Sequence, residues 1–423
     1  MFTNTYLPHV GGVARSVEIL SNDLEKMGHD LLIVAPDFTD TGHQDTNKQV
    51  VRLPAIQNFN GSDFSVIVPI PFVLQEAVSE FQPDIIHSHH PFLLGDSALR
   101  AARNFQLPIV FTHHTLYEQY THYVPFDSDM MKRFIIQLTT QYANMCDQVI
   151  APSQSIADLI IHRGIKRPVT EIPTGVDVDF FTNGEGQAFR DAVGIPADAV
   201  VIGHVGRLAP EKNLAYLARA VSQYLQTDQN VHFLVVGDGP SRKEMEDIFK
   251  ADEVLARVVF AGQKAGTQLR DAYNAMNLFV FSSKSETQGM VLAEAMAAGL
   301  PVVALDASGS REVVIDGQNG RLLSEDATID DFSEAITSLI GNNTLLHYAE
   351  SAKETAQQFS RSICARKVIG LYENAIQHYS TEKDKEPIDI VAWEKFLDRI
   401  NTEWTLLTEK TRAIVDAVMP VKR

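Results

Sequence analysis

Residues 278–305 read LFVFSSKSETQGMVLAEAMAAGLPVVAL. The apolar runs from Leu278 to Ser282 and from Pro301 to Leu305 predict two buried strands of a parallel sheet. The helix-forming run from Met290 to Ala298 lies between them and ends at Gly299, a residue type that often follows the last turn of a helix. A strand, a helix and a second strand in this order are the repeating unit of an α/β fold.

Two carboxylates in this unit, Glu286 and Glu294, have seven residues between them. Glu286 falls in the loop before the predicted helix, and Glu294 falls inside the helix. Gly289 opens the helix and lets the backbone approach a ligand closely. The free N–H groups at a helix start suit a phosphate. We therefore expect the two glutamates to hold a sugar and a ribose whose phosphates lie at the helix terminus.

The same alternation of short apolar runs with helical patterns recurs along the chain and restarts once near the middle. The turn-rich segment from Glu171 to Val178 ends the first series, so we place the domain boundary near residues 175–195. A length of 423 residues fits two domains of roughly 200 residues each, and we predict two doubly wound α/β domains. The other predicted strands are Phe2–Thr5, Leu31–Ala35, Asp84–His87, Ile109–Thr112, Gln148–Pro152, Val200–Val205, His232–Gly237 and Val258–Ala261. Because the first methionine lies almost inside Phe2–Thr5, that strand is short or the true start lies upstream.

The amino-acid composition argues against several functional classes. Hydrophobic residues make up 45% of the chain and charged residues 21%, which is typical of a globular protein, and no stretch of about 18 apolar residues could span a bilayer. The net charge of −18 argues against nucleic acid, which is bound through clustered Lys and Arg. The start of the chain has no signal-peptide pattern, and the two cysteines, Cys146 and Cys364, lie far apart. We therefore expect a cytoplasmic protein.

Two further loops carry candidate ligand-binding residues. Gly11 and Gly12 follow the first predicted strand and precede a helix, so they form either a phosphate-binding loop or an ordinary turn. Arg207 and Lys212 lie five residues apart in the loop after Val200–Val205. They could neutralise a diphosphate leaving group or simply face solvent.

Histidines follow two predicted strands that should be neighbours in the sheet. A zinc site is one interpretation, but the chain has no His-Glu-x-x-His spacing and no cysteine near the histidines. Asp177 and Asp179 could also bind a metal, although a turn is the simpler interpretation. The histidines in question are His87, His89, His90, His113 and His114.

Several motifs together resemble the retaining family 4 glycosyltransferases, over most of residues 1–375. The resemblance implies the GT-B fold, with two Rossmann-like domains facing an inter-domain cleft, a nucleotide sugar held mainly by the C-terminal domain, and neither a metal ion nor a cofactor. It implies an acceptor-side domain over residues 1–180, a nucleotide-sugar-binding domain over residues 181–365, and C-terminal helices over residues 366–423 that return toward the N-terminal domain. The motifs are Gly11-Gly12, Gly206-Arg207 with Lys212, Val236 to Pro240, Ser285 to Gly289, Glu294, and Asp316 to Gly320.

The resemblance also implies roles for individual residues. By position, Arg207 and Lys212 would bind the donor diphosphate, and Gly12 would border the phosphates. Glu294 would bind the ribose hydroxyls, and Glu286 would bind the transferred hexose.

The remaining donor contacts come from backbone and from one histidine. Gly289, Met290 and Val291 would offer backbone N–H groups to the phosphate or the sugar. His114 would contact the sugar near the reacting carbon, with His113 as the competing choice. The resemblance implies a front-face mechanism, in which the donor phosphate helps to deprotonate the acceptor while leaving on the same face. No carboxylate nucleophile is therefore expected, in contrast to the two-carboxylate glycosidases.

The segment 114–125, HTLYEQYTHYVP, is similar to one found in bacterial 1,2-diacylglycerol 3-glucosyltransferases, as is the Ser-Glu-Thr-Gln-Gly form of the glutamate motif. The resemblance implies that His114, Tyr117, Tyr120 and Tyr123 bind the acceptor. It implies a hexosyltransferase that moves glucose from UDP-glucose to diacylglycerol and forms an α-glycolipid. The alternatives are another acceptor (phosphatidylinositol, a glycolipid or a soluble sugar), a GT-B epimerase or phosphorylase, and a nucleotide-sugar sensor without catalysis.

Two segments bear on membrane contact. Met130 to Leu138 can form a helix with an apolar face and a small basic spot, which would lie on the inner face of the cytoplasmic membrane or pack on the core. The N-terminal half is acidic and lacks an obvious basic surface for a membrane. Val391 to Val418 has helical spacing, and Trp393 and Trp404 share one of its faces. We expect this stripe to dock onto the N-terminal domain, with a lipid interface as the alternative.

Overall fold

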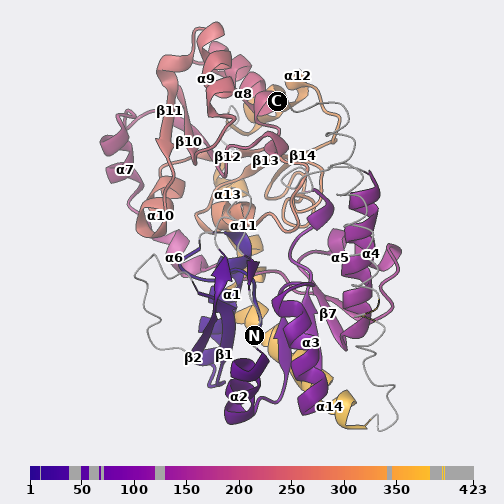
Figure 1. The fold of residues 1–423 in the computed structure, drawn as a ribbon. Helices are drawn as coiled ribbons and strands as arrows, with labels where there is room; N and C mark the ends of the chain where they lie inside the picture. The colour runs from indigo at the N-terminus through magenta and orange to yellow at the C-terminus, as the bar shows by residue number, and fades with distance from the viewer. Residues whose placement is uncertain are drawn as a thin grey trace, which may run out of the picture.

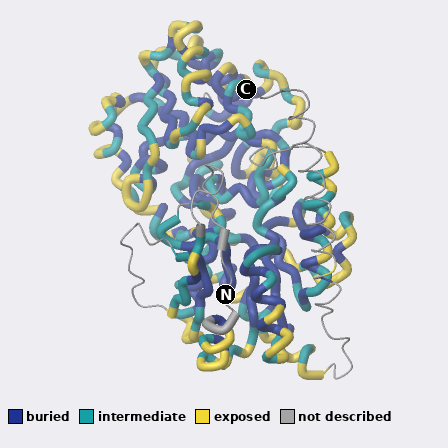
Figure 2. The backbone as a smooth tube through the Cα atoms, viewed as in Figure 1, coloured by how far each residue is buried: buried dark blue, intermediate teal, exposed yellow. Residues whose placement is uncertain are grey.

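The computed structural model describes residues 1–9, 11–37, 49–56, 66–67, 71–119, 129–340, 345–381, 393 and 395. The chain forms two α/β domains, which lie one above the other in Figure 1. Buried strands lie at the centre of each domain and exposed helix surfaces lie outside them (Figure 2). None of the described helices is both long enough and apolar enough to cross a bilayer.

The N-terminal domain is built on a parallel sheet with the order β2-β1-(Phe2)-β5-β6-β7-β8, in which Phe2 bridges β1 and β5. A short antiparallel pair, β3 and β4, lies outside it. The strands are β1 (Leu32–Pro36), β2 (Gln49–Leu53), β3 (Ala55–Ile56), β4 (Val66–Ile67), β5 (Ile86–Ser88), β6 (Ile109–Thr112), β7 (Gln148–Ala151) and β8 (Val169–Glu171). The helices are α1 (Gly12–Lys26), α2 (Pro71–Phe81), α3 (Leu94–Phe105), α4 (Asp129–Met145) and α5 (Gln154–His162).

The first predicted strand, Phe2–Thr5, is reduced to a single bridging residue. Phe2 forms bridges to Val34 of β1 and Ser88 of β5. At Asn4 the backbone N–H bonds to the Nδ1 atom of His90 at 3.0 Å instead of to a strand. The strand pairing ends here because the side chain of His90 accepts the hydrogen bond from the N–H group of Asn4 that would otherwise extend the ladder.

The C-terminal domain contains a six-stranded parallel sheet with the order β11-β10-β9-β12-β13-β14. Its strands are β9 (Val200–Val205), β10 (Val231–Val236), β11 (Val258–Gly262), β12 (Leu278–Phe281), β13 (Val302–Leu305) and β14 (Gly320–Leu323). Its helices are α6 (Val178–Thr182), α7 (Gly186–Val193), α8 (Leu214–Thr227), α9 (Arg242–Ala251), α10 (Gly266–Asn274), α11 (Met290–Ala297), α12 (Ile329–Ile340) and α13 (Leu345–Gln358), with 3-10 turns at Pro210–Lys212 and Leu255–Arg257.

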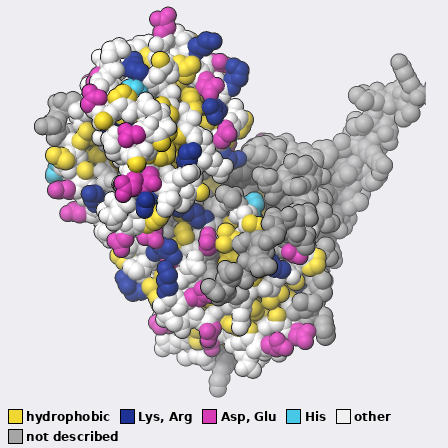
Figure 3. Space-filling model, turned by 90° about the vertical axis from the view of Figure 1, so that its left-hand side faces the viewer, with side chains coloured by type: hydrophobic (Ala, Val, Ile, Leu, Met, Phe, Trp, Pro, Cys, Tyr) yellow, Lys and Arg dark blue, Asp and Glu magenta, His cyan; other side chains and the backbone are white. Residues whose placement is uncertain are grey.

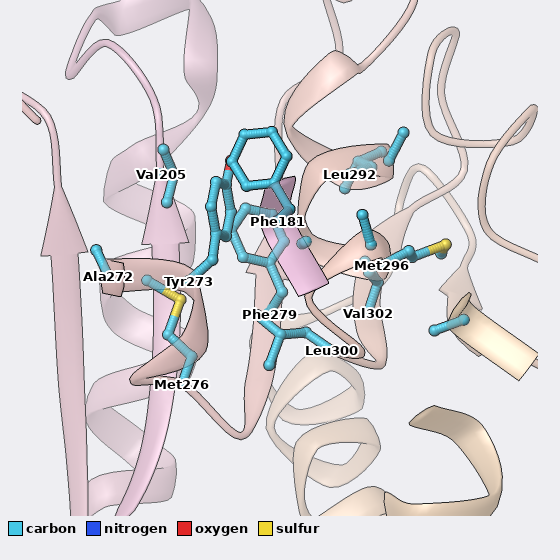
Figure 4. Close-up of a cluster of buried hydrophobic side chains, with 14 of the residues drawn as sticks. Phe181, Val205, Ala272, Tyr273, Met276, Phe279, Leu292, Met296, Leu300 and Val302 are labelled. Carbon is cyan, nitrogen blue, oxygen red and sulfur yellow. The ribbon is translucent and has the colours of Figure 1, made fainter. Parts of the chain in front are cut away.

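Alternation along β9 shows that this sheet is covered on both faces. Val201 and Val205 belong to one buried cluster, and Ile202 between them belongs to the cluster on the opposite face. In the first cluster, the rings of Tyr273 and Phe279 pack beside α11 (Figure 4). Because successive side chains of a strand point to opposite faces, both faces of β9 are buried, and the prediction of a doubly wound α/β fold is confirmed for this domain.

The order of the strands reverses between β9 and β12. From β9 the chain adds β10 and β11 on one side, and from β12 it adds β13 and β14 on the other. In open α/β sheets, ligands bind beyond the carboxyl ends of the strands at such a reversal. The loop with Arg207 follows β9 and the loop with Glu286 follows β12, so the topology places both at this position.

The chain crosses between the domains twice, and the two crossings lie side by side. Val176 on the outward crossing donates from its N–H to the carbonyl of Phe359 at 2.8 Å, and Arg361 on the return donates to the carbonyl of Val176 at 3.1 Å. The return leads into α14 (Arg361–Thr381), which packs on α1 and β6. Figure 1 shows α14 running back through the lower domain.

The tail reaches the N-terminal core through Trp393. This side chain is buried, and its Nε1–H donates to the Oδ1 atom of Asp96 at 2.8 Å. Its ring meets that of Tyr142 edge to face, with centroids 6.1 Å apart. Trp393 therefore docks onto the N-terminal domain, whereas Trp404 lies outside the described residues.

Candidate functional site

A cleft of about 620 Å³ lies between the two domains. The start of α1 and the residues after β6 form its N-terminal wall, and the loops after β9 and β12 together with α11 form its C-terminal wall. The described lining includes Gly11, Gly12, Arg15, His114, Thr115, His204, Arg207, Lys212, Ser285, Glu286, Gly289, Met290, Val291 and Glu294. The structure thus gathers every candidate donor-binding residue at one opening.

Glu286 forms an ion pair with Lys212 inside the cleft. The Lys212 Nζ atom donates to Glu286 Oε1 at 2.5 Å, and both side chains are partly buried. The backbone carbonyls of Lys212 and Asn213 accept from the hydroxyl of Ser282 at 3.1 Å, which fixes the loop after β9 to the end of β12. A cation and a carboxylate are therefore held next to each other at the two strand ends.

Arg207 lies at the outer part of the same loop. Its guanidinium is half exposed and pairs with Glu211 on the following turn. Surface ion pairs of this kind contribute little to stability, so this cation can turn toward an anion in the cleft at small cost.

Glu294 is almost completely buried, with 2% of its side chain exposed. Its Oε1 atom lies 2.7 Å from Nη2 of Arg15, and its Oε2 atom accepts from the hydroxyl of Tyr273 at 2.9 Å. Burial raises the pKa of Glu294, and Arg15 and Tyr273 oppose that rise. Arg15 belongs to α1 and Glu294 to α11, so this ion pair also joins the two domains.

Gly289 begins α11 in a left-handed conformation, with φ of 70°. A Cβ atom at this position would lie 2.6 Å from the carbonyl oxygen of Gly309. Only glycine fits here, because the backbone of another loop occupies the space of a side chain. Met290 and Val291, the first residues of α11, line the cleft, and the free N–H groups of helix starts favour anions.

Gly12 lines the opposite wall, at the start of α1. A Cβ atom at this position would meet no atom within 4 Å. Sterics within the chain therefore do not require this glycine, but it leaves the backbone open toward the cleft.

His114, rather than His113, lines the cleft. Its Nε2 atom lies 2.9 Å from Nδ1 of His89, so one of these two nitrogens carries the proton. Burial and, to a smaller extent, the charge of the neighbouring His113 lower the pKa of His114 to about 3. At neutral pH the ring is uncharged and can accept or donate one hydrogen bond.

His87 and His90 have other partners. The ring of His87 lies 2.6 Å from the hydroxyl of Tyr372 and 2.7 Å from that of Thr112. His90 accepts from the backbone N–H of Asn4. Among the described residues, no group of three His, Cys, Asp or Glu side chains has the arrangement of a metal site.

Asp177 caps a helix where the sequence analysis expected a turn. Its Oδ1 atom accepts from the N–H of Phe180 at 3.1 Å at the start of α6. Its other oxygen lies 3.3 Å from the guanidinium of Arg361.

The predicted acceptor residues are only partly described. Tyr117 packs its ring edge to face against Phe92, with centroids 5.1 Å apart, and it is not part of the cleft lining, whereas Leu116 and Gln119 are. Tyr120 and Tyr123 lie outside the described residues.

Arg15 and His204 line the cleft but were missed by the sequence analysis. Arg15 occurs in a helix without a motif, so no local signal marks it. His204 lies within the apolar strand β9, and its Nδ1 atom is 3.1 Å from the carbonyl of Val280. A polar residue inside a run of valines was the signal that could have identified it.

Two family models match the chain. The model of Glycosyltransferase Family 4 matches residues 10–180, and that of Glycosyl transferases group 1 matches residues 186–359. The two matches divide at the link between the domains seen in the structure.

Comparison with individual proteins also identifies glycosyltransferases as relatives of this chain. An alpha-monoglucosyldiacylglycerol synthase of Streptococcus pneumoniae is 29% identical over 406 residues, which are 94% of this chain and 90% of that protein. A GDP-mannose-dependent alpha-mannosyltransferase of Corynebacterium glutamicum is 30% identical over 339 residues, which are 78% of this chain and 77% of that protein. The solved structure of Anabaena HepE in complex with UDP is similar in fold, with a TM-score of 0.70 at 20% identity over 88% of this chain and 98% of that one. The two parallel-sheet domains and these relatives together show that the chain has the GT-B fold and belongs to the family 4 glycosyltransferases.

Proposed function

We propose that the protein is a retaining glucosyltransferase that transfers glucose from UDP-glucose to diacylglycerol and forms an α-glycolipid. The observation that carries the proposal is the similarity to the alpha-monoglucosyldiacylglycerol synthase, which extends over 94% of this chain and thus over both walls of the cleft. The complex of HepE with UDP supports a uridine nucleotide as donor.

The donor would lie along the C-terminal wall. Arg207 and Lys212 would bind the diphosphate, since both line the cleft where the loop after β9 meets the loop after β12. The hexose would lie against Glu286 and the ribose against Glu294. In this arrangement Lys212 contacts both the phosphate and the carboxylate that it already pairs with at 2.5 Å.

Backbone atoms would complete the donor site. The N–H groups of Gly289, Met290 and Val291 at the start of α11 would bind phosphate or sugar oxygens, and Gly12 would border the phosphates from the other wall. Fixed dipoles of this kind stabilise developing charge without reorganisation during the reaction.

Transfer would proceed on one face of the sugar. The bond between the anomeric carbon and the diphosphate oxygen breaks, the acceptor hydroxyl oxygen bonds to that carbon from the same side, and the hydroxyl proton passes to the departing phosphate. The charge that develops on the phosphate lies next to Arg207 and Lys212, so the protein supplies the neutralisation without a metal ion. His114, neutral because burial lowers its pKa, would hydrogen-bond the sugar without adding charge.

The lipid would approach from the N-terminal wall. His114 follows β6 and lines the cleft, and with Tyr120 and Tyr123 it would bind the acceptor. Tyr117, which packs on Phe92 outside the lining, is not included in this site. The next described segment begins α4 at Asp129, and the following residue, Met130, is 69% exposed. An exposed apolar side chain followed by Lys132 and Arg133 suits peripheral contact with the inner face of the cytoplasmic membrane.

The test is a product analysis. The purified protein is incubated with diacylglycerol vesicles and a panel of nucleotide sugars, and any glycolipid is identified by mass and anomeric configuration. An α-glucosyl-diacylglycerol formed from UDP-glucose supports the proposal. Release of nucleotide without a lipid product refutes the acceptor assignment and directs the search to phosphatidylinositol, glycolipids and soluble sugars.

Mannosyl transfer is a second candidate, favoured by the 30% identity to the GDP-mannose-dependent enzyme. The same panel decides between the two donors. A mannosylated product from GDP-mannose, in the absence of product from UDP-glucose, would replace the first proposal.

A further inference from the structure

The loop that carries Glu286 also binds the N-terminal domain. The hydroxyl of Thr287 donates to the carbonyl of His114 at 3.1 Å. The carbonyl of Thr287 accepts from the hydroxyl of Ser153 at 2.7 Å. Both contacts cross the inter-domain gap at the level of the cleft.

Gln288 makes a paired contact to the same domain. Its Oε1 atom accepts from the N–H of Thr174, and its Nε2 atom donates to the carbonyl of Thr174, both at 2.8 Å. The side chain is 7% exposed, so water competes little for these bonds. Only a side-chain amide can accept and donate toward one backbone residue in this way.

Glu312 adds a connection nearby. One of its oxygens accepts from the N–H of Ser155 in the first turn of α5 at 3.0 Å, and the other accepts from the N–H of Gly309 at 2.8 Å. Gly309 in turn packs its backbone against Gly289. The start of α11 is thus linked to the N-terminal domain on both of its sides.

The loop from Glu286 to Gly289 combines two roles, donor binding and contact with the N-terminal domain. All four residues from Glu286 to Gly289 line the cleft. Glu286 and Gly289 are assigned to the donor, whereas Thr287 and Gln288 between them bond to the N-terminal domain. Glu286, which is assigned to the hexose, directly precedes Thr287 in the chain. The hydroxyl of Thr287 bonds to the carbonyl of His114, so Glu286 is closely connected to the N-terminal domain.

We propose that Thr287 and Gln288 are positioning residues that fix the loop of Glu286 against His114 and Thr174, and so set the position of the donor sugar relative to the acceptor wall. The proposal rests on the proposed function for the roles of Glu286 and His114, but the inter-domain contacts themselves do not depend on it. Apart from Gly12, the proposed diphosphate and ribose contacts lie on the C-terminal domain, so most of the nucleotide site does not depend on these bonds. Transfer does require them, because a small misplacement of the reacting groups costs a large factor in rate.

The variants are chosen to remove bonds with little change of shape. Thr287→Val removes the hydroxyl that reaches His114, and Gln288→Met removes both bonds to Thr174. Thr182→Val is the matched control, because its hydroxyl bonds to the carbonyls of Val178 and Ala297 within the C-terminal domain and also anchors α11.

The first measurement needs no substrate. Spin labels at Arg103→Cys on α3 and Lys243→Cys on α9 report the distance between the domains by pulsed electron resonance, and the native Cys146 and Cys364 are buried. We expect a broader distance distribution in Thr287→Val and Gln288→Met than in the parent protein and in Thr182→Val. Distributions identical to that of the parent protein would overturn the proposal.

The second measurement separates binding from transfer. We expect kcat for sugar transfer to fall roughly tenfold or more in both variants, while the affinity for UDP stays within about twofold of the parent protein. An unchanged kcat, or a loss of UDP affinity as large as the loss of kcat, would also overturn the proposal. If the parent protein transfers no sugar at all, the proposed function has failed, and the distance distributions still decide whether the two residues hold the domains together.

Discussion

Glu294 shows how much of this site depends on a single buried residue. Its carboxylate lies in a nearly water-free position, and Arg15 and Tyr273 offset part of the cost of keeping it charged there. The partners come from different domains, since Arg15 is on α1 and Tyr273 on α10. If a ribose binds Glu294, its hydroxyl groups would donate hydrogen bonds to the carboxylate and would replace the contact with Arg15.

The variant Glu294→Gln tests this residue. Hydrogen bonds to a charged acceptor contribute about 1.5–3 kcal/mol, so the Kd for UDP should rise by roughly 10-fold to 100-fold. Isothermal titration calorimetry measures the change. Glu244→Gln, at an exposed position in the first turn of α9, is the matched control and should bind UDP like the parent protein. Equal affinity of Glu294→Gln and the parent protein would remove Glu294 from the ribose site.

At the scale of elements, β12, its following loop and α11 form the unit on which the site is built. The strand ends at Phe281, the helix starts at Met290, and the loop between them contributes both cleft-lining residues that we propose bind the donor and inter-domain contacts. The left-handed conformation of Gly289 allows the chain to turn into the helix within this short space. The close approach of Gly309 then fixes where the helix begins.

Gly289→Ala tests this geometry against Gly194→Ala, which ends α7 with a similar φ of 77° but has no atom within 4 Å of the added Cβ. The backbone cost alone is about 1–2 kcal/mol, which we expect for Gly194→Ala. Gly289→Ala should lose a further 1–3 kcal/mol, roughly, because the methyl group collides with the backbone of Gly309. Chemical denaturation measures both. Equal losses in the two variants would mean that the contact with Gly309 does not constrain the helix start.

At the scale of the whole molecule, the C-terminal part of the chain returns to the N-terminal domain and packs against it. Arg361 binds both oxygens of Asp23 and begins α14, which runs back along the N-terminal domain. Trp393 then fills a position in the core beside Tyr142. On the face drawn in Figure 3, basic and acidic side chains are interspersed over both domains, and no broad basic field covers the described atoms of that face.

Substitutions of Trp393 test the anchoring of the tail. Trp393→Ala should reduce the free energy of unfolding by about 3–5 kcal/mol, because a large buried ring is removed from the core. Trp393→Phe keeps much of the packing but loses the bond from Nε1 to Asp96, and should lose only about 1–2 kcal/mol. Chemical denaturation gives both values. If Trp393→Ala were as stable as the parent protein, the tail would contribute nothing to the N-terminal core.

The buried histidines predict a pH dependence of stability. Burial lowers the pKa of His90 to about 3 and that of His113 to about 4, and it lowers the pKa values of His87 and His89 in the same direction. The unfolded chain takes up these protons near pH 6.5, whereas the folded chain does not, so stability is fully present above that pH and falls below it. Between about pH 7.5 and about pH 5.5 each of these histidines should lower the free energy of unfolding by about 1.4 kcal/mol. A free energy of unfolding that stays flat or rises over this interval would contradict the prediction.

The sequence by itself determined the regular part of the molecule. The run from Met290 to Ala298 predicted the helix that the structure places at Met290–Ala297, and the apolar run Val200–Val205 predicted β9 with the same bounds. These elements follow from local periodicity and propensity, which act between near neighbours. The loop positions of Glu286, Arg207 and Lys212 follow from the same pattern, because loops after parallel strands meet at one edge of a sheet.

Only the tertiary structure decided which residues that are distant in sequence contact each other. Arg15 reaches Glu294 and Arg361 reaches Asp23 across most of the length of the chain, and Gln288 binds the backbone of Thr174. No periodicity encodes such pairs, since they depend on how two separate sheets are oriented against each other. That His114 lines the cleft and His113 does not also became visible only with the tertiary structure, because both residues follow β6 and local sequence does not say which of them faces the cleft.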